Sequence, residues 1–360
     1  MLGWTLRGDV VQLIDFRKGL VGRKLAGKYV LQRPIGAGGM GSVYRAVQQG
    51  TEARVAVKIL SRDTPDLRTA SRFRQEAEMT ARLTHPNTVR VLDFGVDDDL
   101  FFLVTEFLAG SDLTRFLRRG GQPDNFLVHV LFQVVSSLAE AHSKGVIHRD
   151  IKPNNIMLIH HVGWPSFVKV IDFGIARAVG GPGHGTKGLL GTLGYIAPEQ
   201  TDSERTPDVR SDLYALGCLA YELATGQLPF DGITHRSAPL DILEAHLSSE
   251  PVPVQDIKPS VDDDVAQLIM GLLHKDPSRR PSSAGELVLP LNALKLKFLR
   301  RQSDDRLAGI ASMNETEMTA VQKESPDTFV FQESSSLFGE KTRTDMDDAT
   351  EVGPSHDSTQ

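Results

Sequence analysis

The segment "VIHRDIKPNNIM", residues 146–157, places Asp150, Lys152, Asn154 and Asn155 between two apolar edges. It offers one carboxylate, one ammonium and two amides within six residues. Two interpretations are open for such a stretch. It is either a solvated loop between a helix and a strand, or a loop whose side chains carry out chemistry. The remaining sequence has to decide between them.

A second group of residues that could bind a ligand is the glycine pattern of "IGAGGMGSVYRA", with Gly36, Gly38 and Gly41 in a G-x-G-x-x-G spacing. Alone, this pattern could equally be a hairpin turn. A dinucleotide-binding fold needs a helix directly after the glycines, whereas "SVYRAV" is typical of a strand. A glycine hairpin between two strands lets backbone N–H groups lie over phosphates, so the context favours a phosphate-binding hairpin.

Lys58 is the third candidate, in the run "RVAVKIL", which is apolar on both faces of a predicted strand. An ammonium in such a strand needs an anionic partner or ligand. The alternative is an edge strand whose lysine reaches water. Glu76, on the same face of the helical stretch "ASRFRQEAEMTARL" as Phe73 and Thr80, can supply the anion, or else it is a surface carboxylate.

Two further motifs follow in order along the chain. "VIDFGIAR" places Asp172 directly after a predicted strand, and "GYIAPEQ" contains Glu199. With these five elements, the sequence resembles the protein kinase superfamily over about residues 29–295. "GAGGMGSVYRA", "HRDIKPNNIM" and "GTLGYIAPEQ" are most similar to the bacterial eukaryotic-like (Hanks-type) serine/threonine protein kinases. The opening segment is therefore predicted to be the catalytic loop.

The resemblance implies transfer of the ATP γ-phosphate to Ser/Thr hydroxyls of proteins, with autophosphorylation and a role in signal transduction. Asp150 would accept the proton of the substrate hydroxyl, and Lys152 would steady the transferring phosphate. Thr192, in "GTLGY", would contact both the base and this lysine. Lys58 is the fourth residue expected to act in catalysis. Asp212 and Arg280 resemble scaffold residues of these kinases: Asp212 would brace the catalytic loop, and Arg280 would pair with Glu199.

The resemblance also implies a site for ATP and Mg²⁺, with Mn²⁺ as an alternative metal. Mg²⁺ prefers hard oxygen ligands, which Asn155 and Asp172 would supply, while Lys58 would bind the α- and β-phosphates and pair with Glu76. The residues expected to contact the nucleotide are Ile35, Gly36, Ala37, Gly38, Gly39, Met40, Gly41, Val43, Ala56, Lys58, Glu76, Thr105, Glu106, Leu108, Asp112 and Asn155.

Regulation is expected at Arg149 and Thr186. In kinases with an Arg directly before the catalytic Asp, a phosphorylated residue of the activation loop commonly pairs with that Arg. Thr186 is the candidate, because Thr192 is already assigned to the active site; the alternative is a loop hydroxyl without function. The sequence departs from the common pattern at Thr80, where many active kinases have a larger apolar side chain that docks the helix of Glu76.

The elements that must position these residues change type along the chain. Short β-branched and apolar runs fill residues 29–106 around one helical stretch, and helical patterns dominate after Gly110. Two of these helical stretches end at Gly145 and Gly226. The single cysteine, Cys218, is most simply a small buried apolar residue of the second stretch. We predict an α+β, bilobal protein kinase-like fold, with a small antiparallel-sheet N-lobe holding one main helix and a larger, mostly helical C-lobe. The predicted boundaries are an N-terminal extension (1–28), the N-lobe (29–108), the C-lobe (109–296) and an acidic, Ser/Thr-rich, mostly disordered tail (297–360).

Composition limits the partners and the location. The net charge is −6, of which residues 301–360 carry −8 and the preceding residues +2, so no nucleic-acid-binding surface is expected. No apolar run approaches the roughly 20 residues that span a bilayer, and a cytoplasmic protein without a membrane span is expected. Expected partners are protein substrates, a second copy during trans-autophosphorylation, and a phosphothreonine-binding protein at the tail, where Thr342, Thr344 and Thr350 adjoin acidic residues.

Two other classes of function compete with an active protein kinase. A pseudokinase scaffold is not favoured, because Lys58, Asp150, Asn155 and Asp172 are all present. A phosphotransferase acting on small molecules is disfavoured by "GTLGYIAPE", which resembles the segment that receives a peptide substrate.

Overall fold

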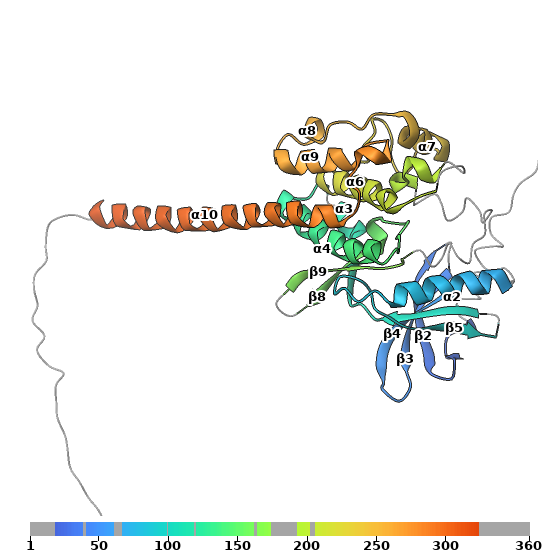
Figure 1. The fold of residues 1–360 in the computed structure, drawn as a ribbon. Helices are drawn as coiled ribbons and strands as arrows, with labels where there is room; N and C mark the ends of the chain where they lie inside the picture. The colour runs from blue at the N-terminus through green and yellow to red at the C-terminus, as the bar shows by residue number, and fades with distance from the viewer. Residues whose placement is uncertain are drawn as a thin grey trace, which may run out of the picture. The chain divides into compact units, whose positions relative to one another are not determined.

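The computed structural model describes residues 19–38, 41–60, 67–98, 100–118, 120–161, 164–173, 193–201 and 206–323. The chain divides into two units, Met1–Asp304 and Asp305–Gln360. The first unit holds two lobes and every residue of the candidate site (Figure 1).

The N-terminal lobe is an antiparallel sheet in the order β1-β2-β3-β4-β6-β5, with the helix α2 against one face (Figure 1). Its elements are β1 (Lys24–Leu25), β2 (Tyr29–Gly38), β3 (Gly41–Gln48), β4 (Ala53–Leu60), α2 (Leu67–Ala81), β5 (Val91–Asp97) and β6 (Leu100–Glu106). The sheet thus begins before residue 29, because β1 pairs with β2 and the side chain of Leu25 is buried.

Alternation along β4 divides its side chains between the two faces of the sheet. Val55, Val57 and Ile59 are buried in the core of one face, and Lys58 points to the other. On the helix side, Phe73 and Ala77 pack against residues of β4 and β6. Phe73, Ala77 and Thr80 of α2 are all buried, and so is Leu83 just after the helix ends.

The C-terminal lobe is mostly helical. Its elements are β7 (Gly110–Asp112), α3 (Thr114–Leu117), α4 (Asp124–Ser143), η1 (Pro153–Asn155), β8 (Ile156–His161), β9 (Trp164–Val170), η2 (Leu193–Tyr195), η3 (Pro198–Gln200), α6 (Val209–Thr225), α7 (Pro239–Ser248), α8 (Val254–Ile257), α9 (Asp263–Leu272), η4 (Pro277–Arg279) and α10 (Gly285–Lys323). β7, β8 and β9 form a small antiparallel sheet. As the sequence predicts, α4 and α6 are followed by left-handed glycines, Gly145 and Gly226.

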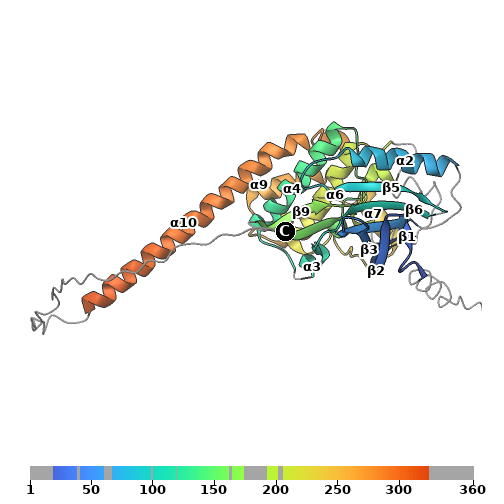
Figure 2. The ribbon, with the colours of Figure 1, turned by 90° about the horizontal axis from the view of Figure 1, so that it is seen from below.

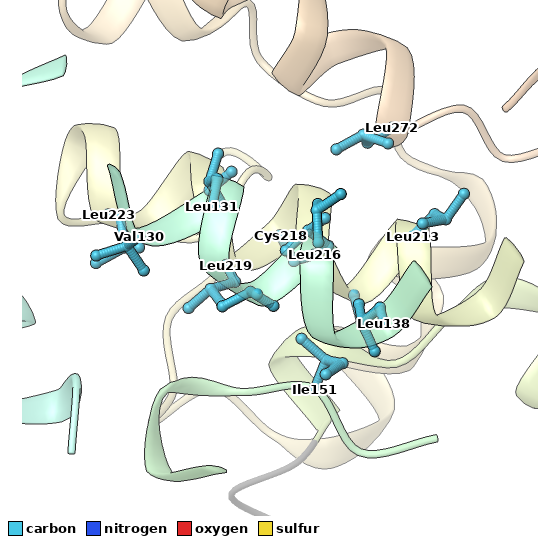
Figure 3. Close-up of a cluster of buried hydrophobic side chains, with 14 of the residues drawn as sticks. Val130, Leu131, Leu138, Ile151, Leu213, Leu216, Cys218, Leu219, Leu223 and Leu272 are labelled. Carbon is cyan, nitrogen blue, oxygen red and sulfur yellow. The ribbon is translucent and has the colours of Figure 1, made fainter. Parts of the chain in front are cut away.

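The core of this lobe lies between α4, α6 and α9. Figure 3 shows Leu131 and Leu138 of α4 facing Leu216 and Leu219 of α6. Cys218 is fully buried in this cluster, as the sequence predicts for a small apolar residue. Viewed from below, α6 runs through the middle of the lobe (Figure 2). The catalytic segment thus rests on a fully packed base.

Among the described helices, α4 is the one whose length and hydropathy would allow it to cross a membrane. Ten of its 20 residues are buried, and the apolar ones belong to the core of the C-terminal lobe. A central core helix of a globular domain has the same composition, and the packing accounts for the apolar character of α4.

The helix α10 extends past residue 297, where the sequence predicts an irregular tail. Lys297 donates to Asp262 (2.7 Å) and Asp264 (2.6 Å), and Arg301 donates to Asp262 (2.9 Å). These contacts fix residues 297–301 to the start of α9. They join residues that are distant in the sequence, so the sequence pattern did not indicate them. Residues 297–323 are therefore helical, and the rest of the predicted tail lies outside the described residues.

Candidate active site

A cavity of about 290 Å³ lies between the two lobes. Its walls are formed by Ile35, Gly36, Val43, Ala56, Lys58, Leu60, Thr80, Val89, Val91, Leu103, Thr105, Glu106, Phe107, Leu108, Asp112, Asn154, Met157, Ile171, Asp172 and Phe173. Most of these side chains are apolar. Of the polar ones, Lys58, Asn154 and Asp172 lie where the catalytic segment meets β4, and Thr105, Glu106 and Asp112 lie at the connection between the lobes. Such a cavity suits a ligand with a flat apolar part and a charged end.

Most residues predicted to contact a nucleotide line this cavity: Ile35, Gly36, Val43, Ala56, Lys58, Thr105, Glu106, Leu108 and Asp112. Ala37, Gly38, Gly41, Glu76 and Asn155 are described but do not belong to its walls, and Gly39 and Met40 lie outside the described residues. Sequence reasoning missed the apolar walls Leu60, Val91, Leu103, Met157 and Ile171. Their strand periodicity was visible, but which face meets the other lobe was not.

The glycine pattern lies in a strand–turn–strand unit, as predicted. β2 and β3 are paired as far as Gly38 and Gly41. Gly41 has a φ of 137°, and a Cβ atom there would lie 2.1 Å from the carbonyl oxygen of Ile59. Only glycine fits this close approach of two strands. No helix follows the glycines, so the dinucleotide-binding alternative is excluded.

Lys58 lies on β4, which has β3 and β6 as neighbours, so the edge-strand alternative is wrong. Its Nζ atom lies 2.8 Å from Oδ1 of Asp172. Burial alone would raise the pKa of Asp172, but the charge and hydrogen bond of Lys58, with smaller contributions from His148 and Lys152, hold it below the usual range. Asp172 is therefore ionised near neutral pH. The contact of Lys58 with Glu76 stays a prediction.

Asp150, Lys152 and Asn155 converge in the catalytic segment. Oδ2 of Asp150 lies 2.8 Å from Lys152 Nζ and accepts a 2.9 Å hydrogen bond from Asn155 Nδ2. The same amide donates to the carbonyl oxygen of Asp150 (2.7 Å). The other carboxylate oxygen, Oδ1, is buried and has no hydrogen-bond partner among the described residues. Buried acceptors are normally satisfied, so this oxygen points to a missing donor, such as a ligand hydroxyl.

The backbone of the segment is braced by Asp212 of α6. This carboxylate accepts from the N–H groups of His148 and Arg149, both at 2.7 Å, and lies 3.0 Å from Nε2 of His142. Arg149 has a φ of 64°, a left-handed conformation that a non-glycine residue adopts only when its surroundings impose it. The bracing role predicted for Asp212 is confirmed by these contacts.

His148 links the segment to the strand end that carries Asp172. Its Nε2 atom lies 2.9 Å from the carbonyl oxygen of Ile171, and its ring centroid lies 4.5 Å from that of Phe173. Asp172 between them also has a left-handed φ, of 61°. These contacts fix the catalytic segment, which carries Asp150, to the strand end that carries Asp172 at the polar end of the cavity.

At the opposite end of the cavity, the side chain of Glu106 is used structurally. It accepts from the backbone N–H of Arg90 (2.9 Å) and from Lys169 Nζ (2.6 Å). Asp112 accepts from the N–H of Thr114 (3.1 Å) and from its hydroxyl. The connection between the lobes is thereby fixed, and its backbone is presented to the cavity.

Thr80 is 4% exposed and lines the cavity. Its hydroxyl donates to the carbonyl oxygen of Glu76 at 2.9 Å, one turn earlier in α2. The departure from a larger apolar residue therefore leaves no unsatisfied hydroxyl, but it places a small side chain at the back of the cavity. If Thr80 weakens the docking of α2, the reason is its small side chain, which fills less space than a larger apolar residue would.

Glu199 and Arg280 form a buried pair below the catalytic segment. The guanidinium makes two hydrogen bonds to the carboxylate, at 2.7 and 3.0 Å, and Ser211 adds a third at 2.7 Å. Burial alone would raise the pKa of Glu199, but Arg280 and Ser211 hold it below its usual range. The pairing predicted from the sequence is confirmed.

Besides Gly39 and Met40, two further predicted residues, Thr186 and Thr192, lie outside the described residues. Arg149 is exposed, and its guanidinium forms no ion pair with any residue in the described part of the chain. This leaves a cation at the edge of the catalytic segment.

Two lobes around a cleft, a glycine hairpin at its edge, Asp172 at its polar end and Asp150 in the adjoining catalytic segment define a protein with a kinase fold. The chain matches the protein kinase domain family over residues 29–291. It belongs to this family, and the predicted bilobal fold is confirmed.

Relatives point to the same family. The chain is 39% identical over 302 residues to serine/threonine-protein kinase pkn3 of Myxococcus xanthus, covering 81% of this chain and 54% of pkn3. It is 38% identical over 273 residues to PrkC of Bacillus subtilis, covering 74% of this chain and 40% of PrkC. The chain thus spans about half or less of the length of these relatives. The crystal structure of the PknI kinase domain of Mycobacterium tuberculosis, 27% identical, matches with a TM-score of 0.58 over 76% of this chain and 97% of that domain.

Proposed function

We propose that this protein is an ATP-dependent serine/threonine protein kinase, which transfers the γ-phosphate of ATP to Ser or Thr hydroxyls of proteins, including its own. The observation that carries the proposal is the asymmetry of the Asp150 carboxylate. Oδ2 is held by Lys152 and Asn155, while Oδ1 is buried without a described partner. An acceptor oxygen that is fixed but unused is what a substrate hydroxyl requires.

Asp150 orients the hydroxyl through Oδ1 and receives its proton as the bond to phosphorus forms. Phosphoryl transfer depends chiefly on positioning and on stabilising charge, so the main task of this carboxylate is to orient the hydroxyl. Lys152 lies beside Oδ2 and can follow the transferring phosphate with its ammonium. Thr192 is proposed to complete this group.

The nucleotide fits the cavity in one orientation. The apolar walls Ile35, Val43, Ala56, Leu103 and Met157 can enclose the adenine ring, next to the backbone of the lobe connection. Lys58 and the glycine hairpin then lie toward the phosphates. Thr105 borders the adenine end, and Asp112 can accept from the ribose hydroxyls.

The donor set at the polar end fits Mg²⁺, which takes oxygen ligands in octahedral geometry. Asp172 supplies an ionised carboxylate. Both described hydrogen bonds of the Asn155 side chain use Nδ2, which leaves its Oδ1 as the ligand atom. When bound, Mg²⁺ neutralises the charge of the phosphates. Mn²⁺ has the same ligand preference.

A protein acceptor is favoured over a small molecule. The relatives pkn3 and PrkC carry the name serine/threonine-protein kinase, and the turn η2 belongs to the segment that resembles the peptide-receiving part of these enzymes. For the parts of the chain outside the site we keep the sequence-based proposals. These are regulation through Thr186 and Arg149, a cytoplasmic location, trans-autophosphorylation by a second copy, and a phosphothreonine-binding partner at the tail.

The experiment is to incubate the full chain with ATP and Mg²⁺, alone and with a mixture of protein substrates, and to map phosphorylated residues by mass spectrometry. Wild type is expected to modify Ser and Thr, and Asp150→Asn is expected to modify none. Transfer to an antibiotic or a sugar with none to any protein would favour a small-molecule phosphotransferase. Nucleotide binding without any transfer would favour a pseudokinase scaffold.

A further inference from the structure

Three side chains from three elements meet beside the turn η2. The hydroxyl of Tyr195 in η2 donates to Oε2 of Glu222, near the end of α6. The other oxygen, Oε1, lies 2.7 Å from Nε2 of His235, in the loop between α6 and α7. The ring of His235 in turn packs near that of Tyr195, with centroids 5.8 Å apart. The three residues therefore form a closed triangle.

Burial makes this triangle depend on His235. Tyr195 and Glu222 are each 5% exposed, whereas the side chain of His235 is 44% exposed. A buried carboxylate is costly unless both of its oxygens are satisfied. His235 is the partner nearest to solvent. Its loss would leave Oε1 of Glu222 without its partner, and Glu222 is the residue that holds Tyr195.

His235 also covers the turn directly. A Cβ atom added at Gly194 would lie 3.0 Å from Cε1 of His235 and 3.2 Å from Cδ2 of Leu228. The ring thus rests on the backbone of η2, next to the hydroxyl contact of Tyr195. The position of the turn is set from two sides by one half-exposed side chain.

We propose that His235 is a positioning residue for the polypeptide substrate. It holds η2 through Glu222 and Tyr195, and η2 presents the surface that receives the substrate beside the acceptor hydroxyl. The proposal rests on the proposed protein kinase activity. His235 should affect the binding of the polypeptide substrate and not the chemical step, because Asp150 and Lys58 are held in place by contacts that do not involve His235.

The arrangement predicts a dependence on pH. The hydrogen bond to Glu222 raises the pKa of His235 above its usual value. Among the described residues, Glu222 and Tyr195 are the titratable groups that face the ring, and burial beside Glu222 raises the pKa of Tyr195 well above the usual range. A raised histidine pKa means that the charged contact is complete below about pH 6.5 and is lost as the pH rises through the raised value. Substrate binding should therefore weaken toward alkaline pH.

The test compares wild type with His235→Ala and His235→Gln as full chains, with Asp231→Asn as a matched control. Asp231 is an exposed residue of the same loop without a described side-chain contact. The measurements are kcat and KM for a phosphorylatable peptide, and KM for ATP, at pH 6.0 and 8.5. We expect His235→Ala to raise the peptide KM about fivefold to tenfold at pH 6.0, as loss of a charged hydrogen bond would. The kcat and the KM for ATP should stay within about twofold.

His235→Gln keeps a donor for Glu222 but cannot titrate, so it should restore part of the peptide affinity and remove its pH dependence. Asp231→Asn should behave as wild type. Peptide phosphorylation by wild type with an unchanged peptide KM in His235→Ala would overturn the inference and leave the proposed function standing. If His235→Ala lowers kcat and raises the KM values for peptide and ATP by similar factors, the inference is overturned as well. Such a result would mean that His235 only supports the fold. Absence of peptide phosphorylation by wild type would refute the proposed function itself.

Discussion

Asp150 and Glu199 are both acidic residues at the edge of the C-terminal lobe's core, but their oxygens have different partners. Glu199 makes three hydrogen bonds to Arg280 and Ser211, so both of its oxygens are satisfied. Asp150 has one satisfied oxygen, and its Oδ1 is buried without a described partner. Among the described residues, the base of the lobe thus satisfies both oxygens of Glu199, whereas the catalytic segment leaves one oxygen of Asp150 without a partner.

The backbone shows the same contrast. Left-handed non-glycine residues occur at Arg149 and Asp172, on either side of the cavity's polar end, while α6 below is a regular helix buried along its length. Strained conformations cost about 1–3 kcal/mol each and persist only where the surroundings impose them. The contrast predicts that changes in the two regions have separable effects on activity and on stability.

The largest effect is expected where the polar end of the cavity loses a charge. Lys58→Met and Asp172→Ala should each lower the initial rate of autophosphorylation by at least about a thousandfold, since several kcal/mol of electrostatic stabilisation are lost. The melting temperature should change little, because both side chains face the cavity. Lys28→Met, at an exposed lysine of the N-terminal lobe, is the control. A rate within about tenfold of wild type for Asp172→Ala would contradict the assignment.

The reverse is expected at the base of the lobe. Arg280→Met removes the cation that pairs with Glu199 and leaves a buried carboxylate without an opposite charge. The free energy of unfolding should therefore fall by about 3–5 kcal/mol. The double variant Glu199→Gln/Arg280→Met should recover part of this loss, because no unpaired charge stays buried. Urea unfolding measures both. If Arg280→Met lowers the free energy of unfolding by less than about 1 kcal/mol, the Glu199–Arg280 pair does not stabilise the lobe as proposed.

The parts that could be predicted from the sequence are those in which local spacing determines the geometry. Asp150, Lys152 and Asn155 lie within one loop, so their convergence follows from a few bonds of chain. The glycine hairpin and the buried face of α2 follow from strand and helix periodicity for the same reason.

The parts that could not be predicted depend on contacts between distant residues. The pairing of Lys58 with Asp172 joins residues 114 positions apart, and the sequence did not indicate it. The short strand β1 and the continuation of α10 depend on partners in β2 and α9. The contact of His235 with Glu222 had no local signal, because a single histidine in a loop is most simply an exposed residue.

An intermediate effect on the phosphorylation rate is expected from the proposed regulation, in which a phosphate on Thr186 pairs with Arg149. A phosphate on Thr186 carries about −1.5 to −2 charges and can pair with the exposed Arg149 through charge-assisted hydrogen bonds. Thr186→Ala and Arg149→Ala should each lower the peptide phosphorylation rate about tenfold, and the double variant should be no slower, because both remove one interaction. Initial rates on an exogenous peptide decide this. A Thr186→Ala protein as fast as phosphorylated wild type would contradict the pairing.

The smallest effects are expected at the C-terminal end of the first unit. Lys297 and Arg301 are partly exposed, and surface ion pairs contribute little on their own. They share Asp262, whose pKa burial alone would raise but whose contacts with both cations hold it below the usual range. A lowered carboxyl pKa means that this contribution is present above about pH 4 and is lost as the pH falls further. Asp262→Asn should therefore lower the melting temperature by a few degrees at most at pH 7, and by less in acid.

Deletion of residues 324–360 should change neither the melting temperature nor peptide phosphorylation, because the described contacts of α10 end at Ser303. Deletion from residue 297 onward should destabilise the protein more than Asp262→Asn, because it removes both cations that this carboxylate binds and also Phe298, which packs against the core of the C-terminal lobe. A strongly destabilised or inactive protein after the shorter deletion would show that the tail contributes to the fold. In that case the tail, as well as the core around α6, would contribute to the stability of the C-terminal lobe.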